Sequence, residues 1–183
     1  MKPILIFDIC ETLLDVDTSK WHPLSSIGGF KELLYEYEKG HIQTEEFLEE
    51  LENRSNFDDI LNKFNSIFSG NWKEGMQNLL SNLIKDGYEI HLLSNLCPIH
   101  WDIAAPILEG YFNKAYLSFE IGARKPNPNI YNYVNSDLGI DNNVDVLFFD
   151  DRPENIKAAR EFGWHPHLFK FSGPVERFIK FFD

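Results

Sequence analysis

The chain has 183 residues and a mass of 21.4 kDa, a length that suits one domain carrying a modest insertion. Its 29 acidic and 17 basic residues give a formal net charge of −12, which disfavours nucleic acids and acidic membrane surfaces as partners. No apolar run approaches the roughly 20 residues of a membrane span. The two cysteines, Cys10 and Cys97, form no disulfide framework, so a reducing cytoplasm is the simplest compartment.

Short apolar runs separated by helical patterns predict a parallel β-sheet. The runs are typical of strands buried on both faces, and they span residues 4–7, 91–93, 115–119, 144–149 and 167–169. Apolar residues at helical spacing predict a helix over 76–84, and Pro98, Pro128 and Pro153 stand where the first turn of a helix tolerates proline. This alternation predicts an α/β fold with a five-stranded parallel sheet covered by helices on both faces.

Residues 16–72 interrupt the alternation, because only helical patterns are visible there, including an apolar stripe from Phe57 to Phe68. We therefore expect a helical insertion over 16–72, between the first strand and the next strand–helix unit. Residues 1–15 and 73–183 then form the core, which ends in a helix over 178–182.

Polar side chains follow the predicted strands, at the edge where parallel α/β sheets place their sites. Asp8 comes directly after the first strand, and a carboxylate at the end of a buried strand is a candidate nucleophile or metal ligand. Ser94 and Asn95 follow the second strand, where a hydroxyl and free backbone amides suit an anionic oxygen. The chain thus offers two polar groups for one site.

Two further clusters add charge to this edge. Lys125, in the segment after the third strand, is a compact cation that can neutralise a phosphate oxygen, and Arg124 beside it adds a second positive charge. Asp150 and Asp151 follow the fourth strand, and two adjacent carboxylates are unfavourable to bury without a cation. Mg²⁺ prefers such hard oxygen ligands, so the pair predicts a magnesium site.

Together the four clusters resemble those of the haloacid dehalogenase (HAD) superfamily, Rossmann-like hydrolases that act through an aspartyl intermediate. The strings LLSNLCPIHW and DDRPENIKAAREFGW are most similar to the branch of α-D-glucose-1-phosphatase-like enzymes. The resemblance implies that residues 16–72 form a small C1-type cap over a Rossmann-like core.

The resemblance also implies roles for individual residues. Asp8 matches the nucleophile that attacks phosphorus, and Thr12 matches the hydroxyl position of the same motif. Ser94 matches the hydroxyl that binds phosphate, with Asn95 as a further contact to the substrate. Lys125 matches the lysine that neutralises phosphate and orients the nucleophile.

The same resemblance implies a set of ligands for Mg²⁺. Asp8 and Asp151 match carboxylates that bind the metal directly, and Asp150 matches a neighbour that often acts through a water molecule. The backbone carbonyl of residue 10 matches a further ligand, and Asn155 lies near this site as a supporting residue.

One position departs from the family pattern. The usual first motif has a second aspartate two residues after the nucleophile, and this aspartate exchanges protons with the leaving group and with water; here the residue is Cys10. The carbonyl of Cys10 can still bind a metal, but loss of a general acid–base group typically lowers the rate by about 10²–10⁴-fold. Three substitutes remain open: a leaving group of low pKa such as an anomeric sugar phosphate, the neighbouring Glu11, or the thiol of Cys10 itself.

The resulting prediction is a Mg²⁺-dependent phosphatase acting on a small phosphate monoester through an aspartyl-phosphate on Asp8. Two alternatives stay open. One is a metal-independent 2-haloacid dehalogenase, although Asp150 and Asp151 would then repel a carboxylate substrate. The other is a catalytically impaired protein of the same fold that binds phosphate without turnover.

Overall fold

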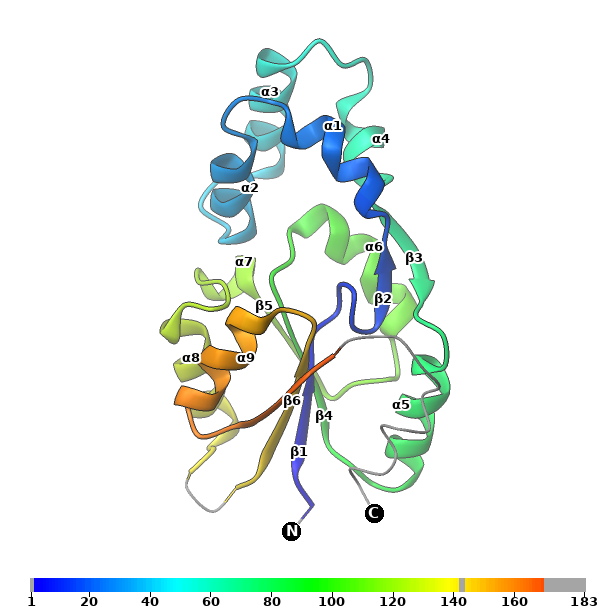
Figure 1. Ribbon diagram of the computed structural model, residues 1–183, viewed down its shortest axis with the longest axis vertical. Helices are drawn as coiled ribbons and strands as arrows, with labels where there is room; N and C mark the ends of the chain where they lie inside the picture. Colours follow the sequence, from blue (N-terminus) through cyan, green and yellow to red (C-terminus); the bar gives the residue numbers. More distant parts are fainter. Residues whose placement is uncertain (1, 142–143, 170–183) are drawn as a thin grey trace.

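The computed structural model describes residues 2–141 and 144–169, and the helix predicted over 178–182 lies outside this part of the chain. Five parallel strands form a sheet in the order β5-β4-β1-β6-β7. Their bounds are Ile4–Phe7 (β1), Ile90–Ser94 (β4), Lys114–Leu117 (β5), Val146–Asp150 (β6) and His165–Leu168 (β7). The predicted five-stranded parallel sheet is therefore confirmed, with β1 at its centre (Figure 1).

Helices cover both faces of the sheet, because successive strand residues point to opposite sides. Leu5 and Phe7 of β1 contribute to one apolar cluster, whereas Ile6 between them contributes to the other. The helices are Met76–Lys85 (α5), Pro98–Leu108 (α6), Ser118–Ile121 (α7), Pro128–Leu138 (α8) and Pro153–Glu161 (α9). None of the helices in the described residues has both the length and the apolar character needed to cross a membrane.

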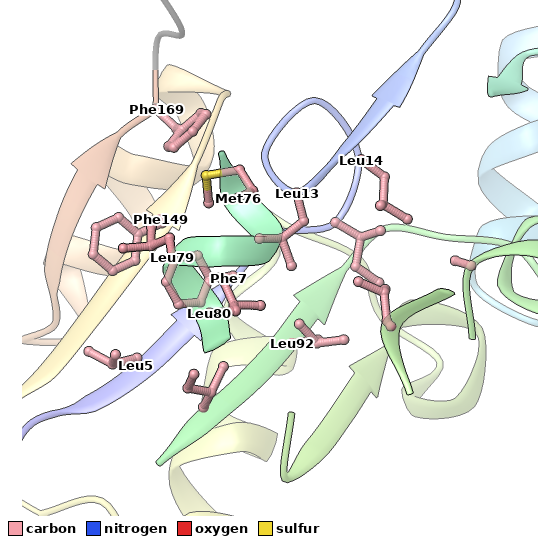
Figure 2. Packing of buried hydrophobic residues seen from close by; sticks show 14 of the residues in the cluster. Leu5, Phe7, Leu13, Leu14, Met76, Leu79, Leu80, Leu92, Phe149 and Phe169 are labelled. Atoms are coloured by element: carbon pink, nitrogen blue, oxygen red, sulfur yellow. The ribbon is translucent and has the colours of Figure 1, made fainter. Parts of the chain in front are cut away.

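The two apolar clusters divide the helices between the two faces. The first cluster packs β1 against α5 and α6, and Figure 2 shows Phe7 beside Leu79 and Leu80. The second cluster packs the opposite face against α8 and α9. The rings of Phe7 and Phe149 stack with centroids 4.6 Å apart, which fixes β1 against β6 just before the carboxylates that follow each strand. The ends of these two strands therefore have well-defined positions.

A helical layer, residues 18–65, lies beyond the carboxyl ends of the strands (Figure 1). It contains Thr18–Lys20 (η1, a short 3₁₀ helix), Trp21–Ser25 (α1), Phe30–Glu38 (α2), Thr44–Arg54 (α3) and Ile60–Asn65 (α4). The layer has an apolar cluster of its own, in which the ring of Phe47 lies 4.3 Å from that of Tyr37 and 5.0 Å from that of Phe64. This packing gives the layer a fixed shape above the sheet.

Two short strands join the helical layer to the sheet. Leu14–Val16 (β2) and Phe68–Trp72 (β3) pair in antiparallel fashion. The expectation that residues 16–72 are helical throughout is therefore wrong at their carboxyl end, where Phe68 belongs to a strand and not to the helix before it. Phe68 is buried while Ser69 and Asn71 are exposed, and this two-residue alternation is the pattern of a strand with one solvated face.

Candidate active site

A cavity of about 210 Å³ lies between the carboxyl edge of the sheet and the helical layer. From the sheet side it is lined by Asp8, Lys125 and Asp151, and from the helical layer by Trp21 and Glu38. Asp8 follows β1, Asp151 follows β6, and Lys125 lies in the segment between α7 and α8. The edge where the strands end thus gathers the charged residues that the sequence places after separate strands.

Lys125 is held at the centre of this charge cluster. Its Nζ lies 2.9 Å from Asp8 Oδ1 and 2.6 Å from Asp150 Oδ2, and it donates to the carbonyl oxygen of Leu93 at 2.6 Å. These three acceptors match the three donors of an ammonium group, so the buried charge is fully satisfied. Burial disfavours the ammonium, but the charges of Asp150 and Asp8 outweigh it and hold the pKa of Lys125 above its usual value.

Asp150 serves to hold Lys125. The side chain is completely buried, and both of its oxygens accept hydrogen bonds from Asn155 Nδ2 at 3.0 Å. Oδ1 also accepts the backbone N–H of Arg152 at 2.8 Å, while Oδ2 receives the bond from Lys125. A carboxylate with this many partners has little capacity for a direct bond to a metal, so its position supports an indirect role.

Asn95 also fixes Lys125, in this case through the backbone. Its Nδ2 donates to the carbonyl oxygen of Lys125 at 2.8 Å, and its Oδ1 accepts the N–H of Lys125 at 2.7 Å. The structure therefore shows that Asn95 positions Lys125, while its contact with substrate stays a prediction. The side chain lines the cavity while both ends of its amide are engaged.

Three carboxylates offer oxygen atoms to one small region. One oxygen each from Asp8, Asp150 and Asp151 lies within 4.8 Å of the others. Burial raises the pKa of Asp8, with Lys125 acting against it and Asp150 adding to it. Burial, followed by the charges of Asp8 and Asp150, raises the pKa of Asp151 to about 6. Lys125 alone does not balance three negative charges, and this excess of hard oxygen donors fits a divalent cation.

The backbone after β1 brings one further oxygen to this cluster. The N–H groups of Leu13 and Leu14 both donate to the carbonyl oxygen of Ile9 at 2.9 Å, which closes a tight loop. Within the described residues, the carbonyl oxygen of Cys10 in that loop accepts no hydrogen bond, and Cys10 lines the cavity. This free carbonyl fits the ligand position that the sequence predicts for residue 10.

Neither Cys10 nor Glu11 in this loop is suited to replace the missing aspartate as general acid and base. Burial, and then the charge of Asp8, raises the pKa of the Cys10 thiol well above its ordinary value, so the thiol stays protonated. Glu11 Oε1 accepts the backbone N–H of Val16 at 2.8 Å, and Glu11 Oε2 lies 2.9 Å from Lys73 Nζ. Both oxygens of Glu11 are thus engaged, which argues against Glu11 as the substitute acid.

Two buried hydroxyl groups lie at this edge of the sheet. Thr12 and Ser94 are completely buried, and the hydroxyl of Thr12 has no hydrogen-bond partner in the described part of the chain, whereas the hydroxyl of Ser94 is close enough to Asp8 to act on its pKa. Ser94 is the last residue of β4 and Thr12 lies in the loop after β1, and neither is among the residues that line the cavity. Buried hydroxyls are rarely left unsatisfied, so the hydroxyl of Thr12 fits a donor to an anionic oxygen.

Glu38 is the one charged cavity residue from the helical layer, and no motif in the sequence points to it. Its Oε2 accepts from Arg124 Nε at 2.9 Å and lies 2.7 Å from Arg124 Nη2. The guanidinium group also lies 3.7 Å from the ring centre of Tyr35. The charge of Arg124, expected to strengthen the positive field around Lys125, is therefore balanced by Glu38.

A weak sequence signal for Glu38 does exist. The buried residues of α2 include Phe30 and Leu34, and Glu38 follows at the same four-residue interval. A carboxylate on the apolar face of a helix needs a partner, and that partner is 86 residues further along the chain.

Comparisons with known proteins agree with this geometry. A family model described as a haloacid dehalogenase-like hydrolase matches residues 3–163. Flavin mononucleotide hydrolase 1 of Arabidopsis thaliana is 33% identical over 172 residues, covering 88% of this chain and 69% of that protein. D-ribitol-5-phosphate phosphatase of Bacteroides thetaiotaomicron is 27% identical over 164 residues, covering 83% of this chain and 76% of that protein.

Solved structures resemble the whole described architecture. HAD family enzyme bt-2542 of Bacteroides thetaiotaomicron, in its magnesium complex, superimposes with a TM-score of 0.85 at 26% identity, covering 98% of each chain. The same wild-type enzyme with magnesium and inorganic phosphate gives a TM-score of 0.81, covering 97% of this chain and 99% of that one.

Proposed function

Because the chain belongs to the haloacid dehalogenase-like hydrolase family, we propose that it is a Mg²⁺-dependent phosphatase of small phosphate monoesters. The observation that carries this proposal is the contact of Asp8 with Lys125 beside two further carboxylates, at the wall of a small cavity. A nucleophilic carboxylate, a buried cation and a hard-ligand cluster are the groups that phosphoryl transfer to an enzyme requires.

The residues of the chain then act in two steps. A carboxylate oxygen of Asp8 bonds to phosphorus while the bond from phosphorus to the leaving oxygen breaks. Water then attacks the aspartyl-phosphate and regenerates Asp8. Lys125 orients Asp8 and neutralises a phosphate oxygen, and the buried hydroxyls of Thr12 and Ser94 are the donors that we propose for the same phosphate. Asp150 and Asn95 act through Lys125, whose side chain and backbone they hold.

The magnesium site that we propose consists of Asp8, Asp151 and the carbonyl oxygen of Cys10, with Asp150 contributing indirectly. When bound, the ion supplies positive charge that favours the developing phosphoryl transition state. This proposal is supported by the close approach of the three carboxylates, and it agrees with the magnesium complex of the similar bt-2542 enzyme.

We propose that residues 16–72 form the cap that selects the leaving group and excludes water, over a core of 1–15 and 73–183. The cavity of about 210 Å³ lies below the roughly 300–1,000 Å³ of ordinary ligand pockets, so it favours a compact substrate. A sugar or polyol phosphate, as in the name of the ribitol-5-phosphate phosphatase, matches this size better than flavin mononucleotide.

Removal of the metal provides the direct test. We expect release of phosphate from a panel of sugar and polyol phosphates in the presence of Mg²⁺, with loss of nearly all activity in EDTA and recovery when Mg²⁺ is added back. Inorganic phosphate is measured in each case. Turnover of 2-chloropropionate that persists in EDTA would instead establish the dehalogenase alternative, for which three clustered carboxylates offer no favourable contact to a carboxylate substrate.

Substitution of Asp151 tests the metal site separately from turnover. Burial and repulsion raise the pKa of Asp151 from 3.8 to about 6, so between these values the folded state binds more protons than the unfolded state. The contribution of Asp151 to stability therefore falls as pH rises from about 4 to 6, and it remains unfavourable at pH 7.

We expect Asp151→Asn to raise the thermal unfolding midpoint of the EDTA-treated protein at pH 7 and to abolish the further rise that Mg²⁺ produces in the wild type. Thermal unfolding followed by circular dichroism measures both effects. The exposed Asp86→Asn is the control for loss of a carboxylate and should leave the rise produced by Mg²⁺ unchanged. An unaltered response to Mg²⁺ in Asp151→Asn would remove Asp151 from the proposed ligands.

A further inference from the structure

Phosphoryl transfer to Asp8 still lacks a group that exchanges protons with the leaving oxygen and with water. Cys10 stands where the usual aspartate would be, so this position carries no carboxylate. The carboxylate of Glu11 is engaged by Val16 and Lys73. The proton therefore has to come from another wall of the cavity.

We propose that Glu38, at the end of α2 in the helical layer, is the general acid and base of this site, replacing the missing aspartate from the opposite side of the cavity. The inference rests on the proposed phosphatase function. Its structural basis is that Glu38 lines the same cavity of about 210 Å³ as Asp8, Cys10 and Asp151, so that a small substrate attached to Asp8 fills the space between them.

The hydrogen bonds of Glu38 leave one oxygen free for this task. Both contacts from Arg124, at 2.9 and 2.7 Å, go to Oε2. Among the described residues, no hydrogen bond or ion pair reaches Oε1. The carboxyl group is thus anchored by one oxygen and can hold or accept a proton at the other.

Arg124 is itself held on both sides. Its guanidinium group stacks 3.7 Å from the ring centre of Tyr35, and the next residue is Lys125, whose backbone is bonded to Asn95. This chain of contacts keeps Glu38 in a fixed relation to the residues that hold Asp8. A general acid needs such a fixed position relative to the reacting oxygen.

The electrostatic surroundings suit both halves of the reaction. Burial raises the pKa of Glu38 to about 7, while the charges of Arg124 and Arg152 lower it and that of Asp8 raises it. Other titratable groups near Glu38 are the thiols of Cys10 and Cys97, which its charge affects in turn. A carboxyl group of this kind is partly protonated near neutral pH, as an acid that must later act as a base requires.

The proton balance is complete without a further reactant. In the first step the bond from phosphorus to the leaving oxygen breaks, and that oxygen takes the proton from Glu38 Oε1. In the second step the ionised Glu38 removes a proton from water as the water oxygen bonds to phosphorus and the bond to Asp8 breaks. Glu38 is protonated again, and the products are an alcohol and inorganic phosphate.

The test is Glu38→Gln, measured on phosphate monoesters whose leaving groups differ in pKa. For alkyl phosphates we expect kcat/KM to fall by about 10²–10⁴-fold, because an alkoxide must be protonated as it leaves. For p-nitrophenyl phosphate the first step needs no acid, so we expect a pre-steady-state burst of p-nitrophenol followed by slow turnover. The burst reports aspartyl-phosphate that accumulates because the amide of this variant cannot take a proton from the attacking water.

Three further variants separate catalysis from a merely structural contact. Arg124→Gln removes the anchor but keeps the carboxylate of Glu38, so it should retain much more activity on alkyl phosphates than Glu38→Gln. Because the positive charge of Arg124 lowers the pKa of Glu38, this variant should also move the Glu38-dependent limb of the plot of kcat/KM against pH to higher pH. Glu36→Gln replaces a half-exposed carboxylate on the same helix that does not line the cavity, and it should leave both substrate classes unaffected. Cys10→Asp in the Glu38→Gln background should restore hydrolysis of alkyl phosphates.

The possible results separate the role of Glu38 from the phosphatase function on which it depends. If Glu38→Gln lowers kcat/KM equally for alkyl and aryl esters and shows no burst, Glu38 is only a structural contact between the helical layer and the sheet, and the inference is overturned. The same conclusion follows if Arg124→Gln loses as much activity on alkyl phosphates as Glu38→Gln. If neither the wild type nor Cys10→Asp releases phosphate in a manner that depends on Asp8, the phosphatase function itself fails, and the role of Glu38 fails with it.

Discussion

Replacing Asp8 with asparagine is expected to reduce release of phosphate from every monoester by about 10⁴-fold or more. An amide is a poor nucleophile toward phosphorus, and Asp150 in the same cluster cannot take its place. Asp150 is completely buried and has partners at both oxygens. The measurement is phosphate release at saturating Mg²⁺, together with the mass of the protein after rapid quenching, which should show a phosphoryl adduct only in the wild type.

The same variant decides between turnover and simple binding. Lys125 keeps its contacts with Asp150 and Leu93 in Asp8→Asn, so the fold should be retained and circular dichroism should match that of the wild type. Activity within about tenfold of the wild type would show that another residue is the nucleophile. A wild type as inactive as Asp8→Asn would support the phosphate-binding alternative.

Replacing Lys125 with methionine is expected to impair both stability and activity. Lys125 is 2% exposed and stands between two carboxylates, so its loss leaves Asp8 and Asp150 without their cation. Removing one partner of a buried charged group typically destabilises a protein by about 3–5 kcal/mol. Loss of a positive group that stabilises the transition state lowers the rate further, by roughly 10²–10³-fold.

Urea denaturation and phosphate release measure the two effects of Lys125→Met. The control is Lys114→Met, because Lys114 is an exposed lysine whose pairing with Asp137 is open to solvent, and little change is expected there. A Lys125→Met protein as stable as the wild type would mean that the carboxylates near Lys125 are not charged in the folded protein.

Much of the site could be anticipated from local sequence patterns. Asp8, Ser94 and Asp150 each follow or end a short buried strand, and such runs are recognisable because they are apolar and bounded by polar residues. The carboxyl ends of parallel strands meet at one edge, so the position of each residue in its strand was enough to bring them together.

The connections to the helical layer were harder to predict. The apolar stripe from Phe57 to Phe68 fits a helix by spacing, but the helix α4 ends at Asn65 and Phe68 lies in β3. A short apolar segment satisfies helical and strand patterns alike, and here pairing with β2 favours the strand.

The sequence by itself determined the α/β class, the buried strand that precedes Asp8, and the chemical character of the groups at the carboxyl edge. Only the tertiary structure decided how these groups pair: Asp150 with Lys125, Asn95 with the backbone of Lys125, and Glu38 with Arg124. Strand burial and helical spacing are local properties of neighbouring residues. The partner of a buried charge depends instead on which distant segments meet, because a few ångströms decide whether an ion pair offsets the loss of hydration.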